Sequence, residues 1–212
     1  MDLLDHLSPS QRVLLPLTNS GYGVGEPGKY CTEETPIRPV SLYGRDKVEV
    51  ERILLDRHPS ALSFRLATVF GMSPRMRLDL LVNDFTYRAY FDRFIVLFES
   101  HFKRNYIHVR DVARAFLHGI DNFDVMQGGP YNVGLSDANL SKLELCQRIQ
   151  RHLPSFVFME SEVGRDPDQR DYIVSNEKIE RTGFRPAFSL DDGIQELVKG
   201  FAMIRNTRYS NV

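Results

Sequence analysis

Residues 13–23 read VLLPLTNSGYG, a short apolar run that turns into a polar loop containing glycine. The run from Val13 to Leu17 does not alternate apolar and polar residues, which is typical of a parallel strand buried on both faces. Helical periodicity follows from Leu42 to Arg57, and residues 62–70 have the composition of a second buried strand. Strand, loop, helix and strand in this order predict a βαβ unit with a right-handed crossover in an open parallel sheet.

The pattern changes after Gly71, where shorter elements follow one another without a linker or an internal repeat. We expect helices over 78–89, 111–121, 141–152 and from Ser189 onward, and strands over 94–98, 106–109 and 131–134. Ser189 is a plausible cap for the last helix because acidic residues follow it in the first turn. The chain therefore predicts an α/β sheet half that carries a small C-terminal α/β lobe.

Composition limits the classes of partner. The chain has 212 residues, 42% of them apolar, and a formal net charge of −1, so no basic stripe favours nucleic acid or anionic lipid. Cys31 and Cys146 lie far apart and form no CxxC pair, which indicates neither a disulfide framework nor a zinc site. The first residues lack the pattern of a signal peptide, and no uncharged run is long enough to cross a membrane. We expect a cytoplasmic protein.

Tyr43 and Lys47 are the most informative pair of residues. Four residues apart on a helix, their side chains stack on one face. A tyrosine hydroxyl is a poor base at neutral pH unless a nearby cation favours the phenolate, and Lys47 would supply that cation. Thr18, at the end of the first strand, would hydrogen-bond the same substrate oxygen. The alternatives are an exposed tyrosine beside a solvated lysine, and a threonine that only caps a turn.

Three segments in a fixed order make the pattern specific: TNSGYG at 18–23, TEETP at 32–36 and YGRDK at 43–47. Their order and spacing resemble the extended short-chain dehydrogenase/reductase family, and in particular its NAD-dependent nucleotide-sugar epimerases and dehydratases. The resemblance implies Thr18 as the catalytic Ser/Thr and Tyr43 as the catalytic base. It implies Lys47 as the lysine that lowers the tyrosine pKa and holds the nicotinamide ribose.

The resemblance extends to the end of the chain. In residues 64–71, FRLATVFG, it implies Val69 at a position facing the cofactor and Thr68 at one facing the substrate. The implied cofactor is NAD, with NADP left open, and the implied substrate is a nucleotide-diphosphate sugar. The fold it implies is a partial Rossmann-type doubly wound parallel sheet with a small C-terminal α/β substrate lobe.

Three further positions are matched to contacts with the nucleotide sugar. The resemblance implies that Asn83 contacts its phosphates, that Arg104 meets its diphosphate and that Arg165 makes a second nucleotide or phosphate contact. A guanidinium suits this task because its fork of donors pairs two phosphate oxygens at once. The alternative for Arg104 is a surface ion pair. His108 is interpreted as a structural histidine, and Arg185 fits a turn before the last helix at least as well as it fits a ligand contact.

By comparison with the family, residues 1–71 correspond to the C-terminal half of an NAD-binding domain. Residues 72–212 are mainly substrate lobe, with 105–121 returning to the NAD-binding domain. The family's Gly-x-x-Gly-x-x-Gly turn, which holds the cofactor pyrophosphate, has no counterpart in the sequence. The comparison leads us to expect that roughly a hundred preceding residues are missing.

The implied reaction starts when Tyr43 takes a proton from a sugar hydroxyl as hydride passes to NAD. The family's 4,6-dehydratases usually follow the catalytic Ser/Thr with an acidic pair, whereas Asn19 and Ser20 stand here. An epimerase or simple oxidoreductase is therefore favoured over a dehydratase. The remaining alternative is a truncated, non-catalytic remnant or interaction module that cannot bind NAD alone. A homodimer through residues 48–57 is consistent with the family.

Overall fold

The parallel sheet predicted from the first seventy residues is present. The computed structural model describes residues 3–164 and 170–203. Strands β1 (Val13–Thr18), β3 (Ala61–Leu66) and β7 (Pro130–Val133) form a three-stranded, all-parallel sheet in the order β1-β3-β7. Helix α1 (Leu42–Arg57) connects β1 to β3, so the expected βαβ unit is confirmed. The fold class is α/β with a Rossmann-like parallel sheet.

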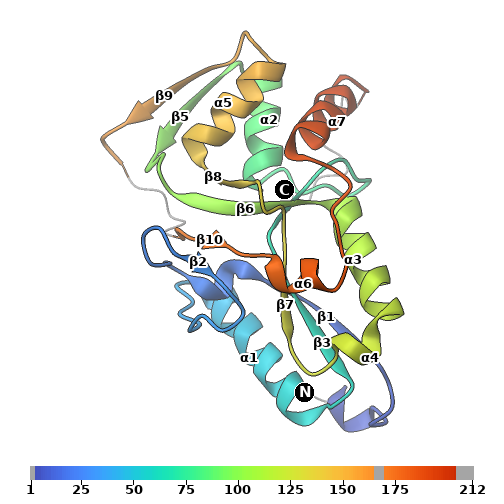
Figure 1. The fold of residues 1–212 in the computed structure, drawn as a ribbon. Helices are drawn as coiled ribbons and strands as arrows, with labels where there is room; N and C mark the ends of the chain where they lie inside the picture. The colour runs from blue at the N-terminus through green and yellow to red at the C-terminus, as the bar shows by residue number, and fades with distance from the viewer. Residues whose placement is uncertain (1–2, 165–169, 204–212) are drawn as a thin grey trace.

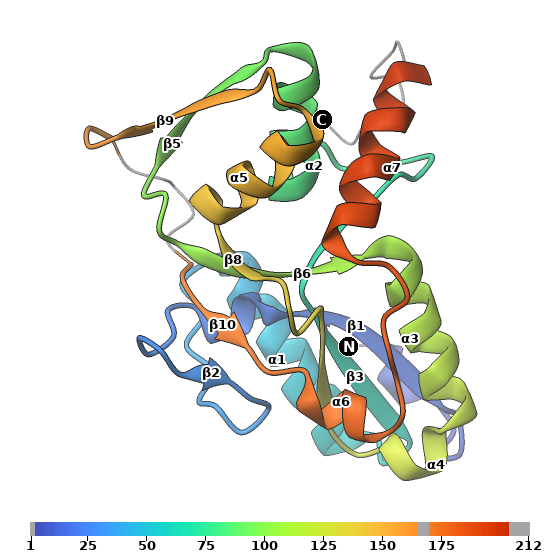
Figure 2. The same ribbon diagram turned by 45° about the horizontal axis from the view of Figure 1, so that its top comes forward.

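Helices lie on both faces of this sheet (Figure 2). Successive side chains of a strand point to opposite faces of the sheet, and in β3 the side chains on the two faces differ in polarity. Phe64 packs in an apolar cluster with Ala115 of α3 (Val109–Asp121). Its neighbour Arg65 points the other way and forms a buried ion pair with Glu51 of α1. One face of the sheet is therefore apolar and the other carries buried charge.

The second predicted strand, 62–70, is two strands rather than one. The chain leaves the first sheet at Ala67, and β4 (Thr68–Phe70) pairs with β6 (Lys103–His108) instead. On its other side β6 pairs antiparallel with β8 (Asn139–Ser141). The apolar run 62–70 gives no sign of this change of partner, because both halves are buried strands of similar composition. Figure 1 shows β6 crossing between the two halves of the molecule.

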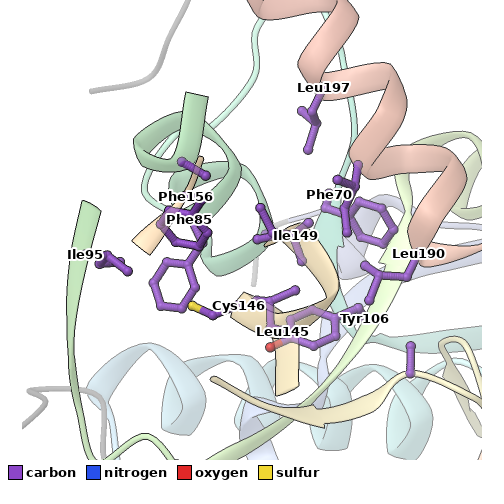
Figure 3. Packing of buried hydrophobic residues seen from close by; sticks show 14 of the residues in the cluster. Phe70, Phe85, Ile95, Tyr106, Leu145, Cys146, Ile149, Phe156, Leu190 and Leu197 are labelled. Carbon is purple, nitrogen blue, oxygen red and sulfur yellow. The ribbon is translucent and has the colours of Figure 1, made fainter. Parts of the chain in front are cut away.

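The C-terminal lobe is built around a large apolar cluster. Its helices are α2 (Leu81–Phe91), α5 (Lys142–His152) and α7 (Leu190–Met203), and a parallel pair of strands, β5 (Phe94–Phe98) and β9 (Val157–Ser161), lies beside them (Figure 1). Figure 3 shows the packing of this cluster, to which α2 contributes Phe85, α5 contributes Leu145 and the loop between α5 and β9 contributes Phe156. All three side chains are almost fully buried, so burial of apolar surface holds this lobe together.

Most of the elements expected from the sequence are present, with ends that differ by a few residues. Ser141 opens α5 with a capping box to Glu144, and the hydroxyl of Ser189 accepts from the backbone N–H of Asp192. The 3-10 turn η1 (Leu4–His6) lies near the N-terminus. Several short elements were not expected from the sequence: β2 (Tyr30–Cys31), β8, β9, β10 (Ile173–Val174), α4 (Phe123–Met126), α6 (Glu177–Arg181) and the 3-10 turn η2 (Asn19–Tyr22). Within the described residues, no helix is both long and apolar enough for a membrane span.

Candidate active site

Thr18 stands at the carboxyl end of β1, where the strand gives way to the turn η2. Its Oγ1 accepts a hydrogen bond from the backbone N–H of Ser20 at 3.1 Å and donates one to Ser20 Oγ at 2.9 Å. Thr18 is half-buried, whereas Ser20 is almost fully buried beneath it. The threonine therefore caps a turn, as one interpretation of the sequence had it, and is at the same time joined to a second hydroxyl at the edge of the sheet.

Helix α1 brings Tyr43 and Lys47 to the same edge. Ser41 caps the helix by accepting from the N–H of Gly44, and the ammonium of Lys47 lies 5.8 Å from the centre of the Tyr43 ring. Tyr43 as a whole is 56% exposed. Gly44 permits the close approach of the helix to the turn, because a Cβ there would lie 3.3 Å from the carbonyl oxygen of Ser20 and 3.0 Å from Pro39.

A recess between β1 and α1 joins two of the three predicted catalytic residues. It contains about 190 Å³ of empty space, part of it open to solvent, and Thr18 and Lys47 both line it. Its polar wall is completed by the Glu51–Arg65 pair, and apolar residues supply the rest: Leu17, Gly21, Ile37 and Val48. Tyr43 is not part of this lining. Arg77 is close enough to Tyr43 to interact with it electrostatically.

Below the recess, the guanidinium of Arg65 ties together the segments that carry the site. It donates to Glu51 at 2.7 and 3.0 Å and to the hydroxyl of Tyr22 at 3.1 Å. Tyr22 in turn donates to Asn132 of β7 at 2.7 Å. Burial raises the pKa of Tyr22 to about 12, although the charge of Arg65 acts to lower it. The phenol therefore remains a neutral donor at physiological pH.

The opposite side of the turn is covered by residues from the C-terminal lobe. Arg170 donates to Ser20 Oγ, which places a guanidinium next to the Thr18–Ser20 hydroxyl pair. Tyr172 meets Tyr22 edge-on, with ring centres 6.2 Å apart, and the guanidinium of Arg104 lies 5.5 Å from the Tyr172 ring. Arg104 is 1% exposed, so it is not the surface ion pair that the sequence left open.

The remaining predicted contacts lie on or near β4. The amide of Asn83 accepts from the N–H of Gly71 at 3.1 Å and donates to the carbonyl of Arg77 at 2.9 Å, so it holds the loop after β4. Thr68 and Val69 are half-buried in β4 itself, and Val69 packs against the core of the lobe. Arg165, the second predicted phosphate contact, lies outside the described residues.

His108 agrees with its interpretation as a structural residue. Its side chain is fully buried, stacks on Phe188 with ring centres 4.6 Å apart, and caps α3 by accepting from the N–H of Arg110. Burial lowers its pKa, with Glu196 acting in the opposite direction. Within residues 3–164 and 170–203, no cluster of His, Cys, Asp and Glu is arranged to hold a metal ion.

Ser20, Arg170 and Tyr172 were not singled out from the sequence. The sequence could have indicated Ser20, because this hydroxyl residue lies only two positions after Thr18. Arg170 and Tyr172 are separated from Thr18 by about 150 positions, and the pairing of β10 with β2, together with the bridge between Asp171 and Val24, brings their segment to the site. No local pattern in the sequence marks such a contact.

The parallel sheet with helices on both faces is that of a Rossmann-like α/β protein, and Thr18 and Lys47 meet at the carboxyl end of its strand β1. The chain belongs to the NAD dependent epimerase/dehydratase family, whose model matches residues 1–134. This is an NAD-dependent family, and several of the solved structures described next hold NAD.

Similar solved structures include dTDP-glucose 4,6-dehydratase of Bacillus anthracis in complex with NAD, with 21% identity and a TM-score of 0.80 over 98% of this chain. They also include UDP-glucose 4-epimerase of Thermus thermophilus with NAD, at 23%, 0.76 and 91%. A third is UDP-glucuronic acid 4-epimerase of Bacillus cereus with UDP-glucuronic acid and NAD, at 19%, 0.81 and 95%. The chain spans 67%, 64% and 65% of their respective lengths, and at these identities the likeness concerns the fold.

The described residues fit part of an NAD site. Lys47 and Thr18 present an ammonium and a hydroxyl at a recess, and these groups suit the hydroxyls of a ribose. Gly21 and Gly23 follow β1, but the turn there is a four-residue 3-10 turn and not the amino end of a long helix that would hold a pyrophosphate. The fit therefore concerns the nicotinamide-ribose end of the cofactor.

Proposed function

We propose that Thr18, Tyr43 and Lys47 are the catalytic residues of an NAD-dependent epimerase, or oxidoreductase, acting on a nucleotide-activated sugar through a transient keto-sugar. The observation that carries the proposal is the recess shared by Thr18 and Lys47, with Tyr43 one turn before Lys47 on the same helix. Membership of the NAD dependent epimerase/dehydratase family supports it. A nucleotide-diphosphate sugar is the proposed substrate and partner.

In the proposed reaction, Tyr43 removes the proton from a sugar hydroxyl while the hydrogen on the same carbon leaves as hydride. NAD, when bound, supplies the acceptor for that hydride. Lys47 donates to the ribose, and Thr18 donates to the sugar oxygen once its hydroxyl turns away from Ser20. Return of the hydride to the opposite face of the keto-sugar would give the epimer.

The residues after Thr18 favour epimerisation over 4,6-dehydration. Elimination of water needs an acid and a base next to the oxidised carbon. Asn19 is a neutral amide, and Ser20 is a hydroxyl engaged with Thr18 and Arg170. Glu33, which follows on the loop, is engaged by the backbone N–H of Asn132 at 2.7 Å. The 4,6-dehydratase is therefore the weaker of the two proposals.

Calorimetric titration of the purified 212-residue protein with NAD, and separately with UDP-glucose and dTDP-glucose, tests the proposal. We expect Lys47→Met to weaken NAD binding about tenfold, or about 1.4 kcal/mol, because the ribose loses a donor. Tyr43→Phe should preserve sugar binding and abolish turnover. Tyr30→Phe is the matched control, because Tyr30 is equally exposed and lies on β2.

The same titration distinguishes the second candidate, a remnant or interaction module that cannot bind NAD alone. A Gly-x-x-Gly-x-x-Gly segment at the start of a long helix would hold a cofactor pyrophosphate, whereas the turn after β1 is a four-residue 3-10 turn, which favours this candidate. If only a longer chain that includes such a segment binds NAD, these 212 residues are part of an enzyme. If the longer chain also fails to bind NAD and nucleotide sugar, the catalytic proposal is wrong.

The division at residue 71, with 105–121 returning to the NAD-binding part, remains a proposal, as does a homodimer through 48–57. In support of assigning 105–121 to the NAD-binding part, α3 packs against the sheet through Ala115 and Phe116. Of the residues that would form a dimer contact, Val50 is 46% exposed on α1, on a surface otherwise rich in charged side chains. Sedimentation of the protein, with Val50→Glu as the disrupting variant, tests the dimer.

A further inference from the structure

Strands β5 and β9 form a parallel ribbon on the outside of the C-terminal lobe. Their register pairs Phe94 with Val157 and Val96 with Met159, so these four side chains share one face of the ribbon. The alternate side chains of β5 point to the opposite face and are buried in the apolar cluster of the lobe. Helices α2 and α5 lie on that inner side, and α7 lies beyond them (Figure 1 and Figure 2). The ribbon therefore has one covered face and one outer face.

The outer face is apolar along its whole length. We call it the outer ribbon face and define it by five side chains, each between 38% and 58% exposed: Phe94, Val96, Phe98, Val157 and Met159. None of the five carries charge. Parallel strands are usually covered on both faces, and a two-stranded sheet is marginal on its own. Among residues 3–164 and 170–203, nothing covers this face more completely.

The size of the outer ribbon face fits a contact between proteins. Large apolar side chains have about 150–250 Å² of surface, so the five exposed fractions correspond to roughly 400 Å². Each partner of a stable complex buries about 800 Å², of which a little over half is apolar. The outer ribbon face supplies most of that apolar area. Exposed charged residues at its two ends, Arg93 before β5 and Glu162 after β9, are available for the polar rim.

We propose that the outer ribbon face binds the same face of a second copy of this chain. Charge complementarity favours this occupant, because an uncharged apolar face meets its own copy without like-charge repulsion and offers no charge that would select an ionic partner. A two-fold contact brings identical residues together near its axis. Val96 is the middle residue of the three that β5 contributes, so the two copies of Val96 lie close together. This contact is separate from residues 48–57 and does not depend on the catalytic proposal.

Sedimentation equilibrium over a wide range of protein concentration tests the contact. We expect the wild-type protein to associate to at least twice the 24.5 kDa of one chain. Met159→Lys places a charge in the outer ribbon face and should raise the dissociation constant at least about tenfold. Val125→Lys is the matched control, because Val125 is 82% exposed on α4 and lies outside the face, so association should not change. Circular dichroism checks that both variants are folded.

Cross-linking tests the same contact without an added charge. Cys31 and Cys146 are both buried, so Val96→Cys introduces one exposed thiol. A short bis-maleimide should join two copies of the Val96→Cys protein. It should leave the Val125→Cys protein largely monomeric.

A monomeric wild-type protein, or equal cross-linking of the two cysteine variants, overturns the proposal. Cover for the face would then have to come from residues outside the described ranges or from a different protein. Association that survives Met159→Lys but is lost in Val50→Glu also overturns it and assigns the contact to residues 48–57. Association that Met159→Lys weakens and Val125→Lys does not supports it, whether or not the protein binds NAD.

Discussion

The sheet half and the C-terminal lobe are held together by different physics. In the sheet half, the face that carries the site is ordered by a buried polar network in which Arg65 bridges α1, the turn after β1 and, through Tyr22, β7. In the lobe, Phe85, Leu145, Phe156 and their neighbours form an apolar cluster (Figure 3). Apolar contacts are not directional, whereas hydrogen bonds fix distances and angles. We infer that the network places the catalytic residues and that the cluster supplies much of the stability.

Removing Arg65 should have the largest effect. Arg65→Met leaves Glu51 buried without its partner, and breaking such a pair costs about 3–5 kcal/mol of unfolding free energy. Urea denaturation followed by circular dichroism measures the loss. Arg52→Ala on the exposed side of the same helix is the control, with an expected loss below about 0.5 kcal/mol. A loss of under about 1 kcal/mol for Arg65→Met would contradict the role given to the network.

The triple variant Glu51→Leu, Ser63→Ala and Arg65→Met sharpens the comparison. Replacing a whole buried ion pair by apolar residues is often neutral for stability. We therefore expect the triple variant to unfold close to wild type and yet to bind nucleotide sugar more weakly, because α1 is no longer aligned by directional bonds. Unchanged ligand affinity in a stable triple variant would mean that the network does not position the site.

Leu145→Ala should lower stability about 2–5 kcal/mol, because a fully buried side chain leaves a cavity in the lobe. Its effect on ligand affinity, measured at a temperature where the variant is folded, should be small. The half-buried Leu143 on the same helix provides the matched control, and Leu143→Ala should cost clearly less. If Leu145→Ala weakened ligand binding as much as the triple variant does, the two regions would not differ in the way proposed.

High pH should loosen the network through Tyr22. Its folded-state pKa, about 12, lies above the ordinary value of 10, so its contribution to stability is fully present below pH 10 and is lost as pH rises through 12. The loss amounts to on the order of 2 kcal/mol. Denaturation of wild type and Tyr22→Phe at pH 9 and pH 11.5 measures it, since the variant should lose less over that interval. Parallel losses in the two proteins would assign the effect to other groups.

The smallest effect is expected at the cap of α5. Ser141→Ala removes one half of the capping box with Glu144 and should cost about 1 kcal/mol. Ser155→Ala, at an exposed serine after the same helix, is the control and should be close to neutral. The cap belongs to the lobe, so ligand affinity should not change. A change in affinity would show that the orientation of α5 reaches the site.

The sequence alone determined the local elements and the identity of the family. The unbroken apolar run 13–17 and the helical period after Leu42 predicted the βαβ unit that the structure contains, because strand and helix periods are properties of neighbouring residues. The order and spacing of the segments that carry Thr18, Tyr43 and Lys47 predicted the family, because these too can be read directly from the sequence. Their catalytic roles remain predictions.

Contacts between distant segments were decided only by the tertiary structure. The change of sheet at Ala67 depends on which strand lies alongside, and composition does not record that. Arg65 is an ordinary charge in a strand until Glu51 and Tyr22 are folded against it. Arg170 reaches Ser20 because its segment pairs with residues near β2 and the turn after β1. A side chain's type is fixed by the sequence, but its burial and its partners are properties of the packed chain, and here they define what the edge of the site is able to bind.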